Sequence, residues 1–148
     1  ISEALASRLE ADGDSAAFRL GKKRARPVAL TQRDVREFQL AKGAVRAGVS
    51  TLLMEAALAV EEISEVLLAG AFGSYINPAS ARAVGLVPPV ALDRVTAVGN
   101  AAGQGAIMAL LSTEMREQAV GIARSVQYVE LAGRPDFMDH FMDSMALA

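Results

Sequence analysis

The stretch LLAGAFGSYINPASARAVGLVPP, residues Leu67–Pro89, decides the fold class of this chain. It opens with an apolar run, passes two glycines, Gly70 and Gly73, and then reaches a helix start. Four consecutive apolar residues, Val66–Ala69, predict a strand that is covered on both faces. A junction of strand, glycine loop and helix either cradles a ligand or makes a tight corner, and both interpretations stay open at this point.

The helix that follows the glycine loop has clear signals at both ends. Asn77 is a favoured N-cap residue, and Pro78 is a favoured first helical residue. Gly85 suits the position just past a helix, so we predict that this helix runs to about Val84.

The same pattern returns further along the chain. Arg94–Val98 predicts a short strand, and Gly99–Ser112 predicts a glycine loop that runs into a helix, with Gly103 and Gly105 in its first turns. Strands that alternate with helices in this way predict an α/β fold, in which a sheet is flanked by helices.

The residues before this region predict a β-hairpin. Residues 1–12 favour a short helix or a tail, and the turn signal DGDS follows at Asp12–Ser15. Strands are predicted near Ala17–Leu20 and Pro27–Leu30. The turn between them is basic, but no aromatic residues are interleaved with its charges, which favours a solvated turn over an anion site. Its cations are Lys22, Lys23, Arg24 and Arg26.

A long helix is predicted next, from a cap at Thr31 and Asp34 to about Ala59. Its interior contains Gly43 and Gly48, each of which costs about 1 kcal/mol relative to Ala. We therefore expect another helix or a ligand to approach the helix backbone closely at these two positions.

Two cations lie on the same long helix, one turn apart. Lys42 and Arg46 are spaced i, i+4, where like charges are mildly unfavourable. An anionic group or an adenine ring beside them would account for the pair. A solvated helix face accounts for it about as well.

The C-terminal part predicts a helix, a strand and a last helix. Glu114–Arg124 predicts the first helix, and the alternating residues Ser125–Leu131 predict the strand. An apolar stripe of Phe137, Phe141 and Met145 marks the last helix and indicates a core or interface position. The single histidine, His140, lies on this helix with three aspartates but without a recognised metal-ligand spacing, so no metal site is predicted. The aspartates are Asp136, Asp139 and Asp143.

The composition excludes several classes of site. The chain has 148 residues, 52% of them hydrophobic, which suits one domain over residues 1–148. The net charge of −2 predicts no nucleic-acid partner, and no run of about 18 apolar residues predicts a membrane span. The absence of cysteine excludes disulfides and thiolate-bound clusters within the chain and favours a cytoplasmic setting. Because the first residue is Ile1 rather than Met, we expect a piece of a longer protein.

Common catalytic templates do not occur in this sequence. There is no G-x-x-x-x-G-K-[ST] and no G-x-S-x-G, and neither glycine segment fits G-x-G-x-x-G. Two strand–glycine–helix junctions remain, after Ala69 and after Val98, where backbone N–H groups can bind an anion or line a nucleoside. Tight packing explains the same glycines equally well.

Four segments, taken in order, resemble one protein family. LLAGAFGSY resembles the adenosine motif of the actin-like ATPase superfamily, which includes acetate and sugar kinases, Hsc70-type chaperones and actin. AVGNAAGQGAIMALL resembles the second connecting motif of that superfamily. Together with LTQRDVREFQLAKGAVRAGVSTLL and YVELAGRPDF, they look like the C-terminal ATPase domain of reductive activators of corrinoid proteins, over Leu30 to about Phe141. The resemblance implies one lobe of an actin-like, ribonuclease H-like ATPase domain, with a mixed sheet flanked by helices.

This resemblance implies ATP-dependent reactivation of corrinoid proteins. In such activators, an iron–sulfur cluster passes one electron to Co(II), which restores the methyl-accepting Co(I), and ATP is coupled to this uphill step. The implied cofactors are ATP, with Mg in the full-length protein, and a cluster outside this chain. The implied partner is a corrinoid protein, and the present chain alone is expected to be inactive.

The resemblance also implies which residues bind the nucleotide. At matching positions, Gly70, Ala71, Phe72 and Gly73 are implied to line the nucleoside. Lys42 and Arg46 are implied to flank the base or ribose, whereas Gly99 and Asn100 are implied to be structural. The phosphate-binding loops are expected upstream, so no residue here is assigned as a catalytic base.

Two alternatives stay open. One is a non-catalytic interaction or dimerisation lobe that keeps the same fold without useful nucleotide affinity, in which the Met/Phe stripe of the last helix forms the contact. The other is a small-molecule kinase of the same superfamily, which ranks last because nothing in the sequence resembles a sugar-binding set.

Overall fold

The computed structural model describes residues 2–13, 15–23 and 26–147, with Asp12, Lys22, Lys23, Arg26 and Phe72 described by backbone alone. Helices and strands form two compact units, residues 1–42 and residues 43–148. The boundary falls inside the long helix α2 (Gln32–Glu55). The predicted α/β class is confirmed, whereas a single domain over the whole chain stays a prediction.

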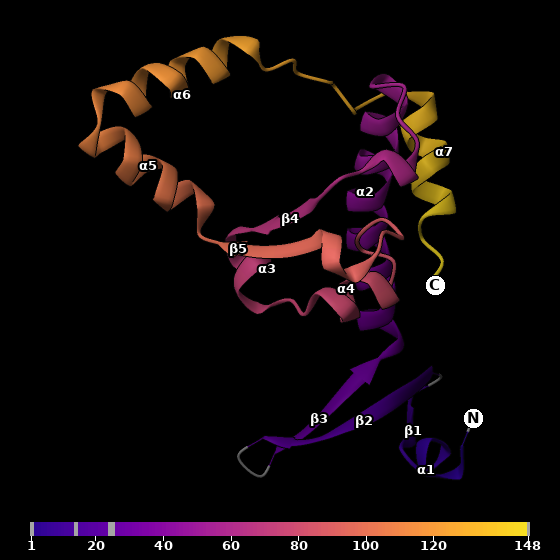
Figure 1. Cartoon of the computed structure of the whole chain (residues 1–148). Coiled ribbons are helices and arrows are strands. Elements are labelled where there is room, and N and C mark those ends of the chain that lie inside the picture. The colour runs from indigo at the N-terminus through magenta and orange to yellow at the C-terminus, as the bar shows by residue number, and fades with distance from the viewer. Residues whose placement is uncertain (1, 14, 24–25, 148) are drawn as a thin grey trace. The chain divides into compact units, whose positions relative to one another are not determined.

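The first unit is built on an antiparallel sheet in the order β1-β2-β3 (Figure 1). The predicted hairpin is confirmed, with Phe18 opposite Leu30. The short N-terminal helix is also present, but the residues after it form a strand because they pair with the hairpin, Leu9 lying opposite Phe18. The elements are α1 (Glu3–Ala6), β1 (Leu9–Asp12), β2 (Ser15–Lys23) and β3 (Arg26–Thr31).

The basic turn of the hairpin lies largely outside the described residues. Arg24 is one of the undescribed positions, and the side chains of Lys22, Lys23 and Arg26 are not described. The solvated interpretation of this turn therefore stays a prediction.

The N-terminus of α2 is capped as predicted. The backbone N–H of Asp34 donates to Thr31 Oγ1 at 3.1 Å, and the backbone N–H of Thr31 donates to Asp34 Oδ2 at 2.8 Å. The Thr31 hydroxyl donates to the same carboxylate oxygen at 2.7 Å. This hydroxyl, followed by the Thr31 backbone N–H, holds the pKa of Asp34 below its ordinary value.

The second unit contains a two-stranded parallel sheet of β4 and β5. Helix α3 packs against both strands, and α4 contacts β5. The predicted cap of α4 is confirmed, since the Ser80 N–H donates to Asn77 Oδ1 at 3.0 Å. The elements are η1 (Val60–Glu62), β4 (Val66–Ala69), α3 (Gly70–Tyr75), α4 (Pro78–Ala83), η2 (Leu92–Arg94), β5 (Val95–Gly99), α5 (Ala101–Leu111), α6 (Thr113–Ser125) and α7 (Pro135–Asp143).

The glycines of α2 face other parts of the second unit. A Cβ added at Gly43 would lie 3.3 Å from Met145 Cγ and 3.4 Å from Phe141 Cε2. A Cβ at Gly48 would lie 3.6 Å from Leu131 Cδ1. Figure 1 shows α7 running beside α2. Helix packing therefore explains Gly43, and the apolar stripe is half-buried at Phe141 and Met145.

The predicted strand over Ser125–Leu131 is wrong. Ser125 ends α6, and the following residues are extended without strand pairing. Their alternation is nevertheless real, because Val129 and Leu131 are half-buried while Tyr128 is exposed. An alternating pattern predicts one covered face, but a strand also needs a hydrogen-bonded neighbour.

Candidate functional site

The carboxyl ends of β4 and β5 lie side by side. The two strands are parallel, and Ala69 at the end of β4 pairs with Gly99 at the end of β5. Both chains then turn through a left-handed glycine, with φ of +66° at Gly70 and +61° at Gly99. Residues with side chains rarely adopt this conformation, so glycine is favoured at both turns. The carboxyl edge of a parallel sheet is where α/β folds usually bind ligands.

The segment after Gly70 is a helix rather than the predicted loop. Helix α3 begins at Gly70 itself, because the left-handed turn leads the strand directly into helical geometry. Within it, the Ser74 hydroxyl donates to the Gly70 carbonyl at 3.2 Å. The first junction is thus strand, helix α3 and helix α4.

Gly73 has a packing role in α3. A Cβ at this position would collide with the Leu68 carbonyl oxygen and lie 2.8 Å from the Gly99 backbone nitrogen. These atoms belong to β4 and β5, so glycine lets α3 lie directly on the backbone of both strands. Packing rather than ligand contact therefore accounts for the glycine at position 73.

Asn100 stabilises the start of α5. Its Oδ1 accepts the backbone N–H of Gly103 at 3.0 Å, which is an N-cap hydrogen bond. A Cβ at Gly103 would collide with the Asn100 amide nitrogen, so the glycine at this position leaves space for the Asn100 side chain that caps the helix. The structural role implied for Asn100 fits this geometry.

Open space lies over the two turning glycines. A Cβ built on Gly70 or on Gly99 would have no heavy atom within 4 Å apart from its own chain neighbours. Ala71, next to Gly70, is exposed, while the Phe72 side chain lies outside the described residues. The structure therefore brings Gly70, Ala71 and Gly99 to one edge of the sheet, where a side chain on either glycine would meet no neighbour.

The two cations of α2 are set in different surroundings. Lys42, at the end of the first unit, is only 3% exposed. Arg46, in the second unit, has a buried Nη1 without a hydrogen-bond partner among the described residues, and burial lowers its pKa. Their placement beside a base or ribose stays a prediction.

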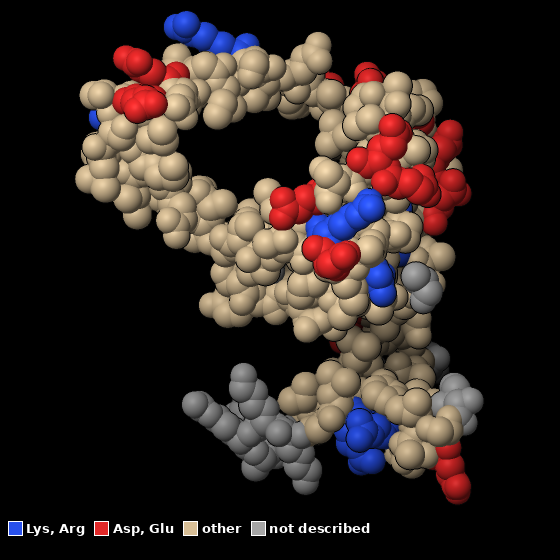
Figure 2. Space-filling view, viewed as in Figure 1, with Lys and Arg blue, Asp and Glu red and all other residues tan. Residues whose placement is uncertain are grey.

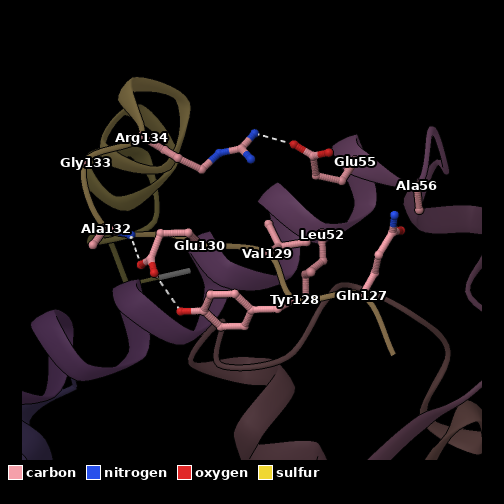
Figure 3. Close-up of a pocket in the computed structure, with 10 residues that line it drawn as sticks. All are labelled: Leu52, Glu55, Ala56, Gln127, Tyr128, Val129, Glu130, Ala132, Gly133 and Arg134. Atoms are coloured by element: carbon pink, nitrogen blue, oxygen red, sulfur yellow. Dashed lines mark hydrogen bonds and ion pairs between the residues drawn. The ribbon is translucent and has the colours of Figure 1, made fainter. Parts of the chain in front are cut away.

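A groove of about 580 Å³ lies elsewhere in the second unit, between the C-terminal end of α2 and the extended segment before α7 (Figure 3). Its apolar floor comes from side chains such as Leu52 and Val129. The Tyr128 hydroxyl donates to Glu130 Oε2 at 2.8 Å, which raises the pKa of Tyr128 and lowers that of Glu130. The lining residues are Leu52, Glu55, Ala56, Gln127, Tyr128, Val129, Glu130, Ala132, Gly133 and Arg134.

One arginine joins the two walls of this groove. Figure 3 shows the Arg134 guanidinium facing Glu55 of α2, and the two form an ion pair. Arg134 also donates from Nε and Nη2 to both carboxylate oxygens of Asp136, at 3.0 and 2.7 Å. The carboxylates of Asp136 and Glu55 together raise the pKa of Arg134. Sequence reasoning missed this groove, since the arginine and its partners are brought together by packing of α7 on α2.

The described residues hold no group of three or more His, Cys, Asp or Glu suited to a metal ion. His140 is half-buried, and its Nε2 is buried without a hydrogen-bond partner in the part of the chain that the structure describes. Across the same residues, no helix is both long and apolar enough to cross a bilayer.

Comparison with known proteins matches the whole chain to one family. The model described as the C-terminal domain of RACo, the ASKHA domain, covers residues 1–148. A solved structure, the reductive activator for corrinoid, iron–sulfur protein, superposes with a TM-score of 0.84 at 32% identity. That match covers 96% of this chain and 23% of the solved chain.

Two curated proteins are also similar. Corrinoid activation enzyme RamQ of Eubacterium limosum is 37% identical over 115 residues, which are 78% of this chain and 19% of RamQ. The [Co(II) methylated amine-specific corrinoid protein] reductase of Methanosarcina barkeri is 28% identical over 99 residues, or 67% of this chain and 18% of that protein. The chain thus spans about a fifth of the length of these relatives.

Proposed function

This chain belongs to the family of the C-terminal ASKHA domain of RACo, and on that basis we propose that it is the nucleotide-binding C-terminal part of an ATP-dependent reductive activator. The full protein would return corrinoid proteins from Co(II) to Co(I) for methyl transfer. The relatives named as a corrinoid activation enzyme and as a Co(II) corrinoid protein reductase support the corrinoid protein as partner.

The observation that carries this proposal is the pair of open glycine turns. Gly70 and Gly99 end adjacent parallel strands, both are left-handed, and the space over both is unfilled. A nucleoside ring needs a flat, side-chain-free wall at close range, and we propose that Gly99, to which the resemblance gave a structural role, forms this wall together with Gly70. Ala71 lies next to this wall, and Phe72 follows it on α3.

The chain supplies some parts of the proposed activity and lacks others. Gly73 and Asn100 hold the wall in shape, through the close approach of α3 and the cap of α5. The phosphates and Mg would be bound by loops of a longer polypeptide. The iron–sulfur cluster must also lie outside this chain, which contains no cysteine, and would supply the single electron that reduces Co(II) to Co(I). The proposal includes a cytoplasmic setting.

Calorimetry with ATP and ADP on the full-length protein tests the nucleotide site. The substitutions Gly70→Ala and Gly99→Ala each place a methyl group in the open space over the wall. We expect each to weaken ATP binding by about tenfold or more, equivalent to a loss of about 1.4 kcal/mol.

Gly133→Ala is the matched control. Gly133 is also left-handed, with φ of +76°, and a Cβ there would also meet nothing within 4 Å. All three variants bear a similar backbone cost of about 1–2 kcal/mol. Equal ATP affinity in Gly70→Ala and Gly133→Ala would contradict the proposed wall, and absence of ATP binding by the unmodified full-length protein would refute the function.

The alternative, a non-catalytic dimerisation lobe, is not favoured by a specific contact surface. Phe141 and Met145, which would have formed the contact, pack against Gly43 within the chain. Met138 and Met142 are the exposed large apolar residues of the last helix. A homodimer therefore stays a prediction, to be checked by sedimentation of the full-length protein.

A further inference from the structure

The largest apolar side chains of helix α5 are exposed to solvent in this chain. Leu110 and Leu111 are 75% and 80% exposed, and Ile107 and Met108 are more than half exposed. None of its residues is buried. Helical spacing places these four residues on one face of α5. The four alanines and Gly105 lie on the other face.

The helix that bears this face carries no charge of its own, and Arg116 of α6 reaches it at the Ala109 carbonyl, to which its Nε donates at 3.1 Å. No Lys, Arg, Asp or Glu occurs from Val95 to Thr113, and Figure 2, viewed as Figure 1, shows tan atoms over α5. A helix that is apolar all round is normally buried in a protein core or a membrane. At about 16 Å, α5 is too short to cross a hydrocarbon layer of about 30 Å, which leaves a protein core.

The neighbouring sheet is also incomplete. Among the described residues, β4 and β5 pair only with each other, and Leu67 of β4 is more than half exposed. Parallel sheets are normally covered on both faces, and two strands alone make a marginal sheet. The same end of the unit therefore presents both an exposed helix and a sheet that α3 and α4 cover only in part, because α5 follows β5 directly after Asn100 (Figure 1).

We infer that the large face of α5, formed by Ile107, Met108, Leu110 and Leu111, is the surface on which the remainder of a longer polypeptide docks in cis. This inference rests on the proposed function. The matched region makes up only 18–23% of these relatives, so a chain of their length has ample residues to supply the missing cover.

Peroxide footprinting of the full-length protein tests this surface without a substitution. Met108 on α5 and Met142 on α7 have nearly equal exposure in this chain, 52% and 59%. Methionine oxidation follows exposure, so a docked α5 predicts that Met142 is oxidised roughly ten times faster than Met108. Equal oxidation of the two methionines would overturn the inference.

A substitution pair provides the second test. Leu110→Glu with Leu111→Glu should expose Met108 to peroxide and lower the melting temperature of the full-length protein. Met138→Glu with Met142→Glu changes two similarly exposed residues on α7 and should do neither. An α5 variant as stable as this control, with Met108 still protected, would count against docking.

Two further measurements separate the other outcomes. Protection of Met108 that is lost on dilution, together with a dimer in sedimentation, would assign the surface to a second copy and overturn docking in cis. Calorimetry with ATP on the same samples keeps the two proposals apart. If the protein binds ATP but Met108 is readily oxidised, only the docking surface is refuted. If Met108 is protected but ATP does not bind, the docking surface is supported and the nucleotide site is refuted.

Discussion

Replacing Gly73 with alanine should destabilise the protein, although alanine is the better helix former. Relative to glycine, alanine inside a helix gains about 1 kcal/mol. At Gly73, however, the added methyl group would collide with the Leu68 carbonyl oxygen and approach the Gly99 nitrogen to 2.8 Å. Both are backbone atoms of the sheet, so no side chain can move aside and α3 must shift. Overpacking of this kind costs up to about 3 kcal/mol, which leaves a net loss of about 2 kcal/mol.

Gly121→Ala on α6 is the matched comparison. Gly121 is also helical, but a Cβ there would meet nothing within 4 Å, so only the propensity gain of about 1 kcal/mol applies. Urea unfolding followed by circular dichroism should therefore separate the two variants by about 3 kcal/mol, with Gly73→Ala below the unmodified protein and Gly121→Ala above it. Two variants of equal stability would refute the argument that α3 lies on strand backbone.

The remaining predictions concern helix caps. The hydrogen bonds from Thr31 lower the pKa of Asp34 from 3.8 in the folded protein. The ionised carboxylate therefore stabilises the fold above pH 3.8, and this stabilisation is lost as the pH falls through the lower pKa of the folded state. Asp34→Asn should therefore flatten the acid limb of the stability curve, measured by urea unfolding from about pH 5 to pH 2, and an unchanged limb would show that the cap does not titrate. Asn77→Ala removes the acceptor for the Ser80 N–H and should cost about 1 kcal/mol, whereas Asn77→Ser should restore most of it.

Local signals located several elements correctly. Thr31 with Asp34, and Asn77 with Pro78, mark helix starts because a cap is formed by residues within one turn of each other. The apolar run Val66–Ala69 is a strand as predicted. The two caps depend on neighbours in sequence, which is why spacing alone was sufficient, whereas the strand also needs its partner β5.

Other features depended on partners far away in the chain. Ser125–Leu131 alternates like a strand, yet a strand exists only where another one pairs with it. The residues after Gly70 looked like a loop, and they form a helix because α3 can rest on the backbones of β4 and β5 at Gly73. The groove around Arg134 was not predicted for the same reason, since Glu55 lies on a distant helix.

The amino-acid pattern alone is sufficient to recognise the α/β class, the family and the two strand–glycine–helix junctions. The pattern allowed two interpretations of each glycine, because the space left by a missing side chain can hold either a ligand or a packed neighbour. The tertiary structure shows what occupies that space at each glycine. At Gly43 it is filled by α7, at Gly73 by the strands beneath α3, and at Gly70 and Gly99 it is open at the edge of the sheet.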